Sequence, residues 1–140
     1  MTIHFVIPTK NEEMTIQSVI QTLGEIARAQ EWQYKIFLVD DSNDRTSEIA
    51  KSLGATVING ENKGLGYAVL KGLRFALDPT CDRLVSLDSD GQVDLHELVD
   101  FVKYSMNNDV DLLLSSRFLN GNHLDYTYPT WSDPRIFGHC

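Results

Sequence analysis

Short apolar segments alternate with amphipathic segments through most of this chain, and that alternation limits the folds it can adopt. Segments with the length and composition of buried strands lie at residues 3–7, 35–39, 56–59, 83–87 and 110–115. The segments between them repeat apolar residues at helical spacing. Strands that alternate with helices are typical of βαβ units. The sequence therefore predicts an α/β fold in which helices flank a mainly parallel sheet.

The apolar stripe of each predicted helix indicates the side that faces the sheet. In chain order these stripes are Ile16, Val19, Ile20, Leu23 and Ala27; Ile49, Ala50 and Leu53; Val69, Leu73 and Ala76; and Leu95, Leu98, Val99 and Val102. The residues from Pro8 to Asn11 are expected to end the first strand, and Gly54 to end the second helix.

Polar clusters follow the predicted strands at the point where each strand ends. They are Pro8-Thr9-Lys10-Asn11, Asp40-Asp41, Asn62-Lys63-Gly64 and Asp88-Ser89-Asp90. In open parallel sheets, ligands bind at the carboxyl ends of the strands. The shared position of these clusters favours an enzyme site over scattered surface charge.

Asp88 and Asp90 are separated by one residue directly after an apolar run. In an extended backbone, side chains at i and i+2 point to the same face, so both carboxylates can converge on one point. Oxygen ligands of this kind suit Mg²⁺ or Mn²⁺ and, through the metal, a diphosphate. An Asp-x-Asp pair also occurs in ordinary solvated turns, and Asp40-Asp41 after an earlier strand supports the functional interpretation.

Other polar residues have two interpretations each. Asp40 and Asp41 suit either capping of the next helix or hydrogen bonds to the base or ribose of a nucleotide. Gly64 precedes a predicted helix, where it is either a helix entry or a point at which the backbone approaches a phosphate. Arg117 suits a surface ion pair or a phosphate contact. The first strand is not followed by a glycine fingerprint, which disfavours a dinucleotide site.

The composition limits the kinds of ligand that the chain is expected to bind. The chain has 140 residues, enough for one core, and a formal net charge of −8, which argues against nucleic acid but permits a nucleotide that brings its own metal. Cys81 and Cys140 suggest neither a disulfide framework nor a zinc site, and fit free thiols in a reducing compartment. We expect neither a signal peptide nor a transmembrane span. The expected location is the cytoplasm, including the cytoplasmic face of a membrane.

Taken together, the motifs resemble those of family 2 glycosyltransferases, and most closely the polyprenyl-phosphate sugar synthases. They are Val6 to Glu13, Leu38 to Ser42, Asn62 to Gly64, Leu87 to Gln92 and Ser115 to Phe118, within a resemblance that covers residues 3 to 118. It implies a Rossmann-like GT-A nucleotide-sugar-binding fold. It also implies inverting transfer of a sugar from a GDP- or UDP-sugar to an acceptor. The candidate acceptor is a polyprenyl phosphate at the membrane surface.

The resemblance also implies roles for individual residues. The expected nucleotide-binding residues are Pro8, Thr9, Glu12, Asp40, Asp41, Lys63 and Gly64, with Asp41 reaching the base. Asp88 and Asp90, with Gln92 as a further ligand, would hold Mg²⁺ or Mn²⁺ against the diphosphate. The metal would neutralise charge on the leaving nucleotide. Arg117 would hold a phosphate of donor or acceptor, which makes Asp88, Asp90 and Arg117 the implied catalytic residues.

The acceptor side is expected to be incomplete. Residues 1–118 would form the donor-binding domain and residues 119–140 an acceptor-side loop, because family members usually continue further. We therefore expect a fragment or a shortened product. Its tail has Asp125 and Asp133, neither in a matching motif, which leans toward a phosphate acceptor that needs no general base. Lys10 stands where the family often has an aromatic residue, so base stacking is in doubt.

Two other functions stay open. The first is a truncated, non-catalytic module that binds a nucleotide or a protein. The second is a phospho-acceptor receiver domain, which would need its acidic pair after the first strand, where Pro8-Thr9-Lys10 stands. A shortened sheet could also leave an edge strand that pairs with a second copy of the chain.

Overall fold

The computed structural model describes residues 1–90, 94–108 and 110–114. The chain divides into two compact units, the first Met1–His96 and the second beginning at Glu97. The first unit contains strands β1 (Thr2–Thr9), β2 (Gln33–Asp40), β3 (Thr56–Asn59) and β4 (Arg83–Ser86), and helices α1 (Ile16–Ala29), α2 (Thr46–Ser52) and α3 (Leu65–Ala76). Helix α4 (Leu98–Asn107) belongs to the second unit.

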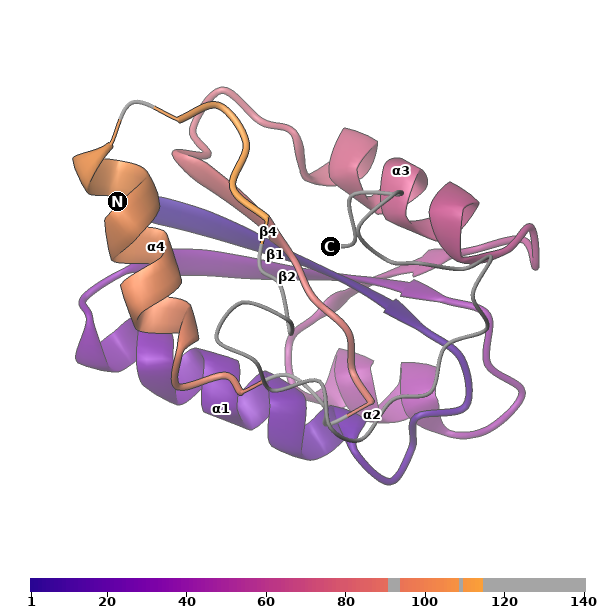
Figure 1. Cartoon of the computed structure of the whole chain (residues 1–140). Helices are drawn as coiled ribbons and strands as arrows, with labels where there is room; N and C mark the ends of the chain where they lie inside the picture. Colours follow the sequence, from indigo (N-terminus) through magenta and orange to yellow (C-terminus); the bar gives the residue numbers. More distant parts are fainter. Residues whose placement is uncertain (91–93, 109, 115–140) are drawn as a thin grey trace, which may run out of the picture. The chain divides into compact units, whose positions relative to one another are not determined.

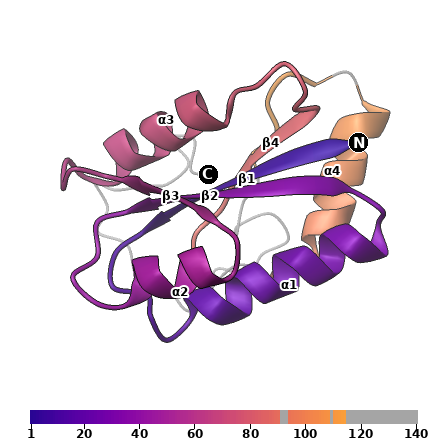
Figure 2. The same cartoon turned by 180° about the vertical axis from the view of Figure 1, so that it is seen from behind.

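The four strands form one parallel sheet in the order β3-β2-β1-β4. Figures 1 and 2 show α3 on one face of this sheet and α1 and α2 on the other. The predicted α/β fold with a parallel sheet flanked by helices is confirmed. The order places β1 and β2 in the middle, so their carboxyl ends lie side by side at the centre of one edge.

Strand β1 continues through Pro8 and Thr9, two residues beyond its predicted end. The carbonyl of Val6 accepts from Leu87 on the β4 side, whereas the carbonyl of Thr9 accepts from Asp41 on the β2 side. Main-chain groups alternate between the two sides, so Pro8 faces β4, and the β1–β4 pairing ends at Val6. The missing N–H of Pro8 therefore costs no ladder hydrogen bond, and proline does not end the strand.

Helix α3 faces the sheet with small residues: Ala76 is buried as predicted, whereas Ala68 and Gly72 take the place of the predicted Val69 and Leu73. Its buried residues are Ala68, Gly72 and Ala76, and Val69 and Leu73 are half-buried. A Cβ added at Gly72 would lie 2.4 Å from Cγ1 of Val6 and 2.7 Å from Cγ2 of Val39. The helix can approach the sheet this closely because small side chains line its contact surface.

Helix α1 covers the opposite face as predicted. Its buried residues include the whole predicted stripe: Ile16, Val19, Ile20, Leu23 and Ala27. Helix α2 ends where expected, since Leu53 follows it and Gly54 adopts φ 87°, a left-handed conformation that suits glycine.

The fifth predicted strand, residues 110–115, is wrong over the part that the structure describes. Residues 110–114 form no strand, and Ser115 lies outside the described residues. The N–H of Val110 bonds to the carbonyl of Asn108 at 2.9 Å, and Leu112 is 75% exposed. An apolar run becomes a strand only when another strand satisfies its main chain, and the local bond of Val110 takes the place of such pairing.

Candidate functional site

The carboxyl ends of β1, β2 and β3 are joined by hydrogen bonds. The Thr9 hydroxyl donates to Oδ1 of Asp40 at 2.8 Å, and Thr9 itself is only 5% exposed. The Asp41 N–H donates to the Thr9 carbonyl, and the Gly60 N–H donates to the Asp40 carbonyl, each at 3.0 Å. Three strand ends therefore form one connected edge, as their order in the sheet requires.

Asp40 shapes its own loop. Its Oδ1 also accepts from the Ser42 hydroxyl at 2.5 Å and from the Ser42 N–H at 3.3 Å, which is the pattern of an Asx turn. Helix α2 begins after Arg45, and Asp44 accepts from the N–H of Thr46 at 3.0 Å. Asp40 therefore does not cap the helix as one interpretation proposed, because the helix starts too far along the chain.

Asp41 holds the loop between β3 and α3. Its Oδ1 accepts from the Asn62 N–H at 2.8 Å, and its carboxylate lies against Gly60, where an added Cβ would be 2.4 Å from Oδ1. The loop requires unusual backbone angles, with φ 63° at Glu61, 51° at Asn62 and 91° at Gly64. Asp41 therefore fixes a strained turn at the edge of the sheet.

Gly64 lies directly before helix α3, as predicted. It is the N-cap residue, and its carbonyl accepts from the Ala68 N–H at 3.0 Å. Nothing lies within 4 Å of a Cβ placed there. Its φ explains the choice of glycine, and the open space leaves the helix N-terminus accessible.

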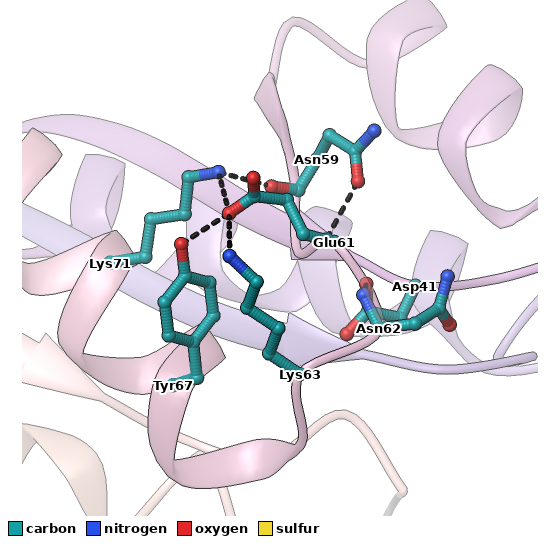
Figure 3. Close-up of polar contacts among 7 residues, drawn as sticks. All are labelled: Asp41, Asn59, Glu61, Asn62, Lys63, Tyr67 and Lys71. Carbon is teal, nitrogen blue, oxygen red and sulfur yellow. Dashed lines mark hydrogen bonds and ion pairs between the residues drawn. The ribbon is translucent and has the colours of Figure 1, made fainter.

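A charged cluster sits on this turn, made of Glu61, Lys63, Tyr67 and Lys71, and we call it the Glu61 cluster (Figure 3). Oε2 of Glu61 accepts from the Tyr67 hydroxyl and lies 3.1 Å from Nζ of Lys71 and 3.5 Å from Nζ of Lys63. The Lys63 ammonium is also 4.8 Å from the centre of the Tyr67 ring.

The hydrogen bond from Tyr67, followed by that from Lys71, lowers the pKa of Glu61 to about 2. The same carboxylate raises the pKa of Lys63. Glu61, Tyr67 and Lys71 were not among the site residues expected from the sequence. The signal that could have found Tyr67 and Lys71 is their i, i+4 spacing, which puts both on one side of a helix.

The loop after β1 is tied to the loop after β2. The Asn11 N–H donates to the Ser42 hydroxyl at 2.7 Å, and the Glu12 N–H donates to the Thr46 hydroxyl at 2.9 Å. Pro8 is buried, and Glu12 is half-buried at the start of α1. Pro8 and Glu12 therefore stand at the same edge as Asp40 and Asp41, as predicted from the strand ends.

Asp88 and Asp90 lie in the segment that follows β4, which bends at Ser89 and Asp90. Burial alternates along it: Leu87 and Ser89 are buried, whereas Asp88 and Asp90 are exposed. The Ser89 carbonyl accepts from the Thr15 hydroxyl at 2.8 Å, which ties the segment to α1. Both carboxylates are therefore accessible, and their convergence on one point stays a prediction.

A pocket borders the segment that carries Asp88. Asp88 lines a pocket of about 240 Å³ together with Ser18 and Thr22 of α1 and with Asp94 and His96. Within residues 1–90, 94–108 and 110–114, no three His, Cys, Asp or Glu side chains form a group able to hold a metal ion. A cation at Asp88 and Asp90 would thus need ligands from a bound molecule or from elsewhere in the chain.

Two predicted site residues, Gln92 and Arg117, lie outside the described residues, as does the predicted tail from residue 119. Among the helices that the structure describes, none combines the length and the apolar character needed to cross a bilayer.

Comparisons with known proteins agree with the geometry. The model of glycosyl transferase family 2 matches residues 4–138. The chain is 32% identical over 129 residues to the low-salt glycan biosynthesis hexosyltransferase Agl6 of Haloferax volcanii, and 34% identical over 116 residues to the dolichyl-phosphate hexose transferase of that organism. These alignments cover 91% and 83% of this chain but only 30% and 48% of the two relatives.

A solved structure also has a fold similar to that of this chain. Glucosyl-3-phosphoglycerate synthase from Mycobacterium tuberculosis, in complex with Mn²⁺, UDP and glucosyl-3-phosphoglycerate, superposes with a TM-score of 0.61 at 27% identity. The superposition covers 75% of this chain and 39% of that chain. The chain therefore spans less than half the length of these relatives.

Proposed function

Because the chain belongs to glycosyl transferase family 2, we propose that it moves a sugar from a nucleotide diphosphate sugar to an acceptor, with inversion at the anomeric carbon. The hydrogen-bonded edge at Thr9, Asp40 and Asp41 carries this proposal, because it gathers polar groups where parallel sheets bind ligands. Donor binding would involve residues 1–118, and residues 119–140 would begin the acceptor side.

The nucleotide would bind against the edge, with Asp41 reaching the base or ribose. Pro8, Thr9, Glu12 and Asp40 would shape the pocket from the loops after β1 and β2. Lys63 and Gly64 would face the diphosphate, because one carries a cation and the other opens the N-terminus of α3. UDP is the nucleotide named in the structure of the synthase from M. tuberculosis, and UDP and GDP are both to be tested here.

The residues at the end of β4 fit a divalent metal. Asp88 and Asp90 offer two exposed carboxylates as hard oxygen ligands, and Mg²⁺ typically takes one or two carboxylates together with phosphate oxygens and water. Gln92 would be a further ligand. A bound metal would offset negative charge on the departing diphosphate. Mn²⁺ is present in the related synthase structure, which supports the same requirement here.

The acceptor would be a polyprenyl phosphate at a membrane surface. Its phosphate oxygen would form a bond to the anomeric carbon while the bond from that carbon to the nucleotide diphosphate breaks, and the nucleotide diphosphate leaves. An ionised phosphate needs no general base for this attack. The relative from H. volcanii is called a dolichyl-phosphate hexose transferase, which supports a lipid phosphate. Arg117 would contact a phosphate of donor or acceptor.

A non-catalytic nucleotide-binding or protein-interaction module is the second candidate. The observation that favours it is that the outer strands β3 and β4 each pair with a single strand among the described residues. These two strands would then suit pairing with a second copy.

A transfer assay separates the two functions. Radiolabelled UDP-glucose, UDP-N-acetylglucosamine or GDP-mannose is incubated with dolichyl phosphate, Mn²⁺ and the purified chain, with the Asp90→Asn variant as control. Labelled lipid that is made by the wild type and not by the variant would support catalysis. Nucleotide binding without labelled lipid from any donor would favour the binding module instead.

A further inference from the structure

Within the Glu61 cluster, the carboxylate of Glu61 offsets the positive charge that would attract a nucleotide diphosphate to this edge. We propose that Glu61 is an internal counter-ion, which holds Lys63 in a resting position until the diphosphate of a nucleotide draws the lysine away. Glu61 would thereby set the donor affinity without touching the donor. This inference rests on the proposed function, because it assumes that a nucleotide diphosphate binds at the edge of the sheet.

Glu61 is held in place by contacts other than its ion pair with Lys63. Its N–H donates to Oδ1 of Asn59 at 2.7 Å, and the next residue, Asn62, is held by Asp41 at 2.8 Å. Its carboxylate accepts from Tyr67 and Lys71 of α3 (Figure 3). The carboxylate is therefore fixed both through the backbone of the turn and through side chains of the helix.

The two lysines are held to different degrees. Nζ of Lys71 donates to the Asn59 carbonyl at 2.7 Å and to Glu61 at 3.1 Å, and its side chain is 22% exposed. Nζ of Lys63 lies 3.5 Å from Glu61, and its side chain is 55% exposed. Lys71 is thus part of the support, whereas Lys63 can exchange one anion for another at little cost.

The position of Lys63 in the chain puts it near the proposed donor phosphates. It lies between Asn62, which Asp41 holds, and Gly64, which starts α3. A phosphate at the N-terminus of α3 would meet backbone N–H groups there. A phosphate there would attract the Lys63 ammonium away from Glu61, so the carboxylate and the diphosphate would compete for one cation.

The competition predicts whether a substitution of Glu61 raises or lowers the affinity for the nucleotide. Glu61→Gln keeps the size of the side chain and an oxygen that accepts from Tyr67, but removes the charge that holds Lys63. Exposed ion pairs of this kind are weak, so we expect nucleotide affinity to rise only about two- to fivefold. Removal of an unrelated surface carboxylate should leave the affinity unchanged.

The test is a double-mutant cycle on the dissociation constant of UDP or GDP, whichever binds more tightly, in the presence of Mn²⁺. The proteins are the full chain with its natural sequence, Glu61→Gln, Lys63→Met and the double variant. Glu48→Gln is the matched control, because Glu48 forms an exposed pair with Arg45 at 3.5 Å on α2, which covers the other face of the sheet (Figure 2). Thermal unfolding confirms that each variant is folded.

The expected result is tighter binding by Glu61→Gln, no change in Glu48→Gln, and no effect of Glu61→Gln once Lys63 is methionine. Weaker or unchanged binding by Glu61→Gln in a folded protein would overturn the inference while leaving donor binding intact. An equal gain in the Lys63→Met background would overturn it too, since the effect would then be plain repulsion between Glu61 and the ligand. If the natural chain binds neither nucleotide, the proposed function fails, and this inference fails with it.

Discussion

The polar edge of the sheet has two sides that are built differently. Between β1, β2 and β3, hydrogen bonds connect one loop to the next, such as Thr9 to Asp40 and Asn62 to Asp41, each at 2.8 Å. Beyond β4, Asp88 and Asp90 are exposed and alternate with the buried residues Leu87 and Ser89. We call these the connected side and the acidic side.

The difference shows how the two sides would treat a ligand. The connected side has its polar groups in place before a nucleotide arrives, so these groups lose little conformational freedom on binding. On the acidic side, neighbouring carboxylates repel one another, and a cation would stabilise them. Substitutions on the connected side should therefore change both folding and binding, and substitutions on the acidic side should change binding alone.

The largest effect is expected from Asp90→Asn on the acidic side. Loss of one metal-binding carboxylate should weaken Mn²⁺-dependent nucleotide binding at least about tenfold, or roughly 1.4 kcal/mol. The free energy of unfolding should change by no more than about 0.5 kcal/mol, because Asp90 is exposed. Calorimetric titration and urea unfolding measure the two quantities. Unchanged affinity would remove Asp90 from the metal site and end the contrast.

The connected side is tested by Gly60→Ala. The new methyl group would displace the Asp41 carboxylate, now 2.4 Å from that position, and break its bond to Asn62. We expect a loss of about 1 kcal/mol in unfolding free energy together with weaker nucleotide binding. Gly66→Ala is the matched control, since nothing lies within 4 Å of its added Cβ, and there alanine should stabilise helix α3 by up to about 1 kcal/mol. Equal effects of both variants would argue against a fixed Asp41.

Thr9→Val gives a smaller change on the connected side. Valine has the shape of threonine but cannot donate to Asp40, which keeps its bonds from Ser42. A loss of roughly 0.5–1.5 kcal/mol in unfolding free energy is expected, with an accompanying drop in nucleotide affinity. Denaturant unfolding measures the first effect. A drop in affinity without any loss of stability would indicate that Thr9 contacts the ligand directly instead of supporting Asp40.

The smallest effect is a pH dependence that comes from Glu61. Its pKa is about 2 in the folded protein and 4.5 in the unfolded reference, so the unfolded chain takes up the proton first as the pH falls. The stability from this group is complete above pH 4.5 and disappears as the pH falls toward 2. Unfolding midpoints at pH 5 and pH 3 should therefore differ less in Glu61→Gln than in the natural chain. If the unfolding midpoint changes equally between pH 5 and pH 3 in Glu61→Gln, in Glu48→Gln and in the natural chain, Glu61 contributes nothing to the pH dependence of stability.

Much of the fold follows from patterns of single segments. The strand at residues 56–59 and the stripe on α1 could be predicted because period and composition are local properties. The inward face of α3 could not, because small residues at Ala68 and Gly72 make the contact, and their importance depends on how close the sheet lies. The strand predicted at residues 110–115 failed over its described part because pairing needs a partner that an apolar run does not specify.

The site shows the same division. The clustering of Asp40, Asp41, Asp88 and Asp90 beyond strand ends follows from the α/β pattern. That Asp40 turns back to Ser42 while Asp41 holds Asn62 depends on side-chain geometry within the loops. Of the Glu61 cluster, Lys63 was expected, but Glu61, Tyr67 and Lys71 were missed, because the left-handed backbone at Glu61 is not a conformation that glutamate signals from the sequence.

The most direct test of the central claim is calorimetric titration of UDP and GDP into the purified chain, with and without Mn²⁺, beside Asp90→Asn and Gly60→Ala. The account predicts that one nucleotide binds, that binding strengthens with Mn²⁺, that Asp90→Asn loses the Mn²⁺ effect, and that Gly60→Ala weakens binding under both conditions. Failure of both nucleotides to bind, with or without the metal, would contradict the claim that the edge formed by Thr9, Asp41 and Asp90 is a donor site.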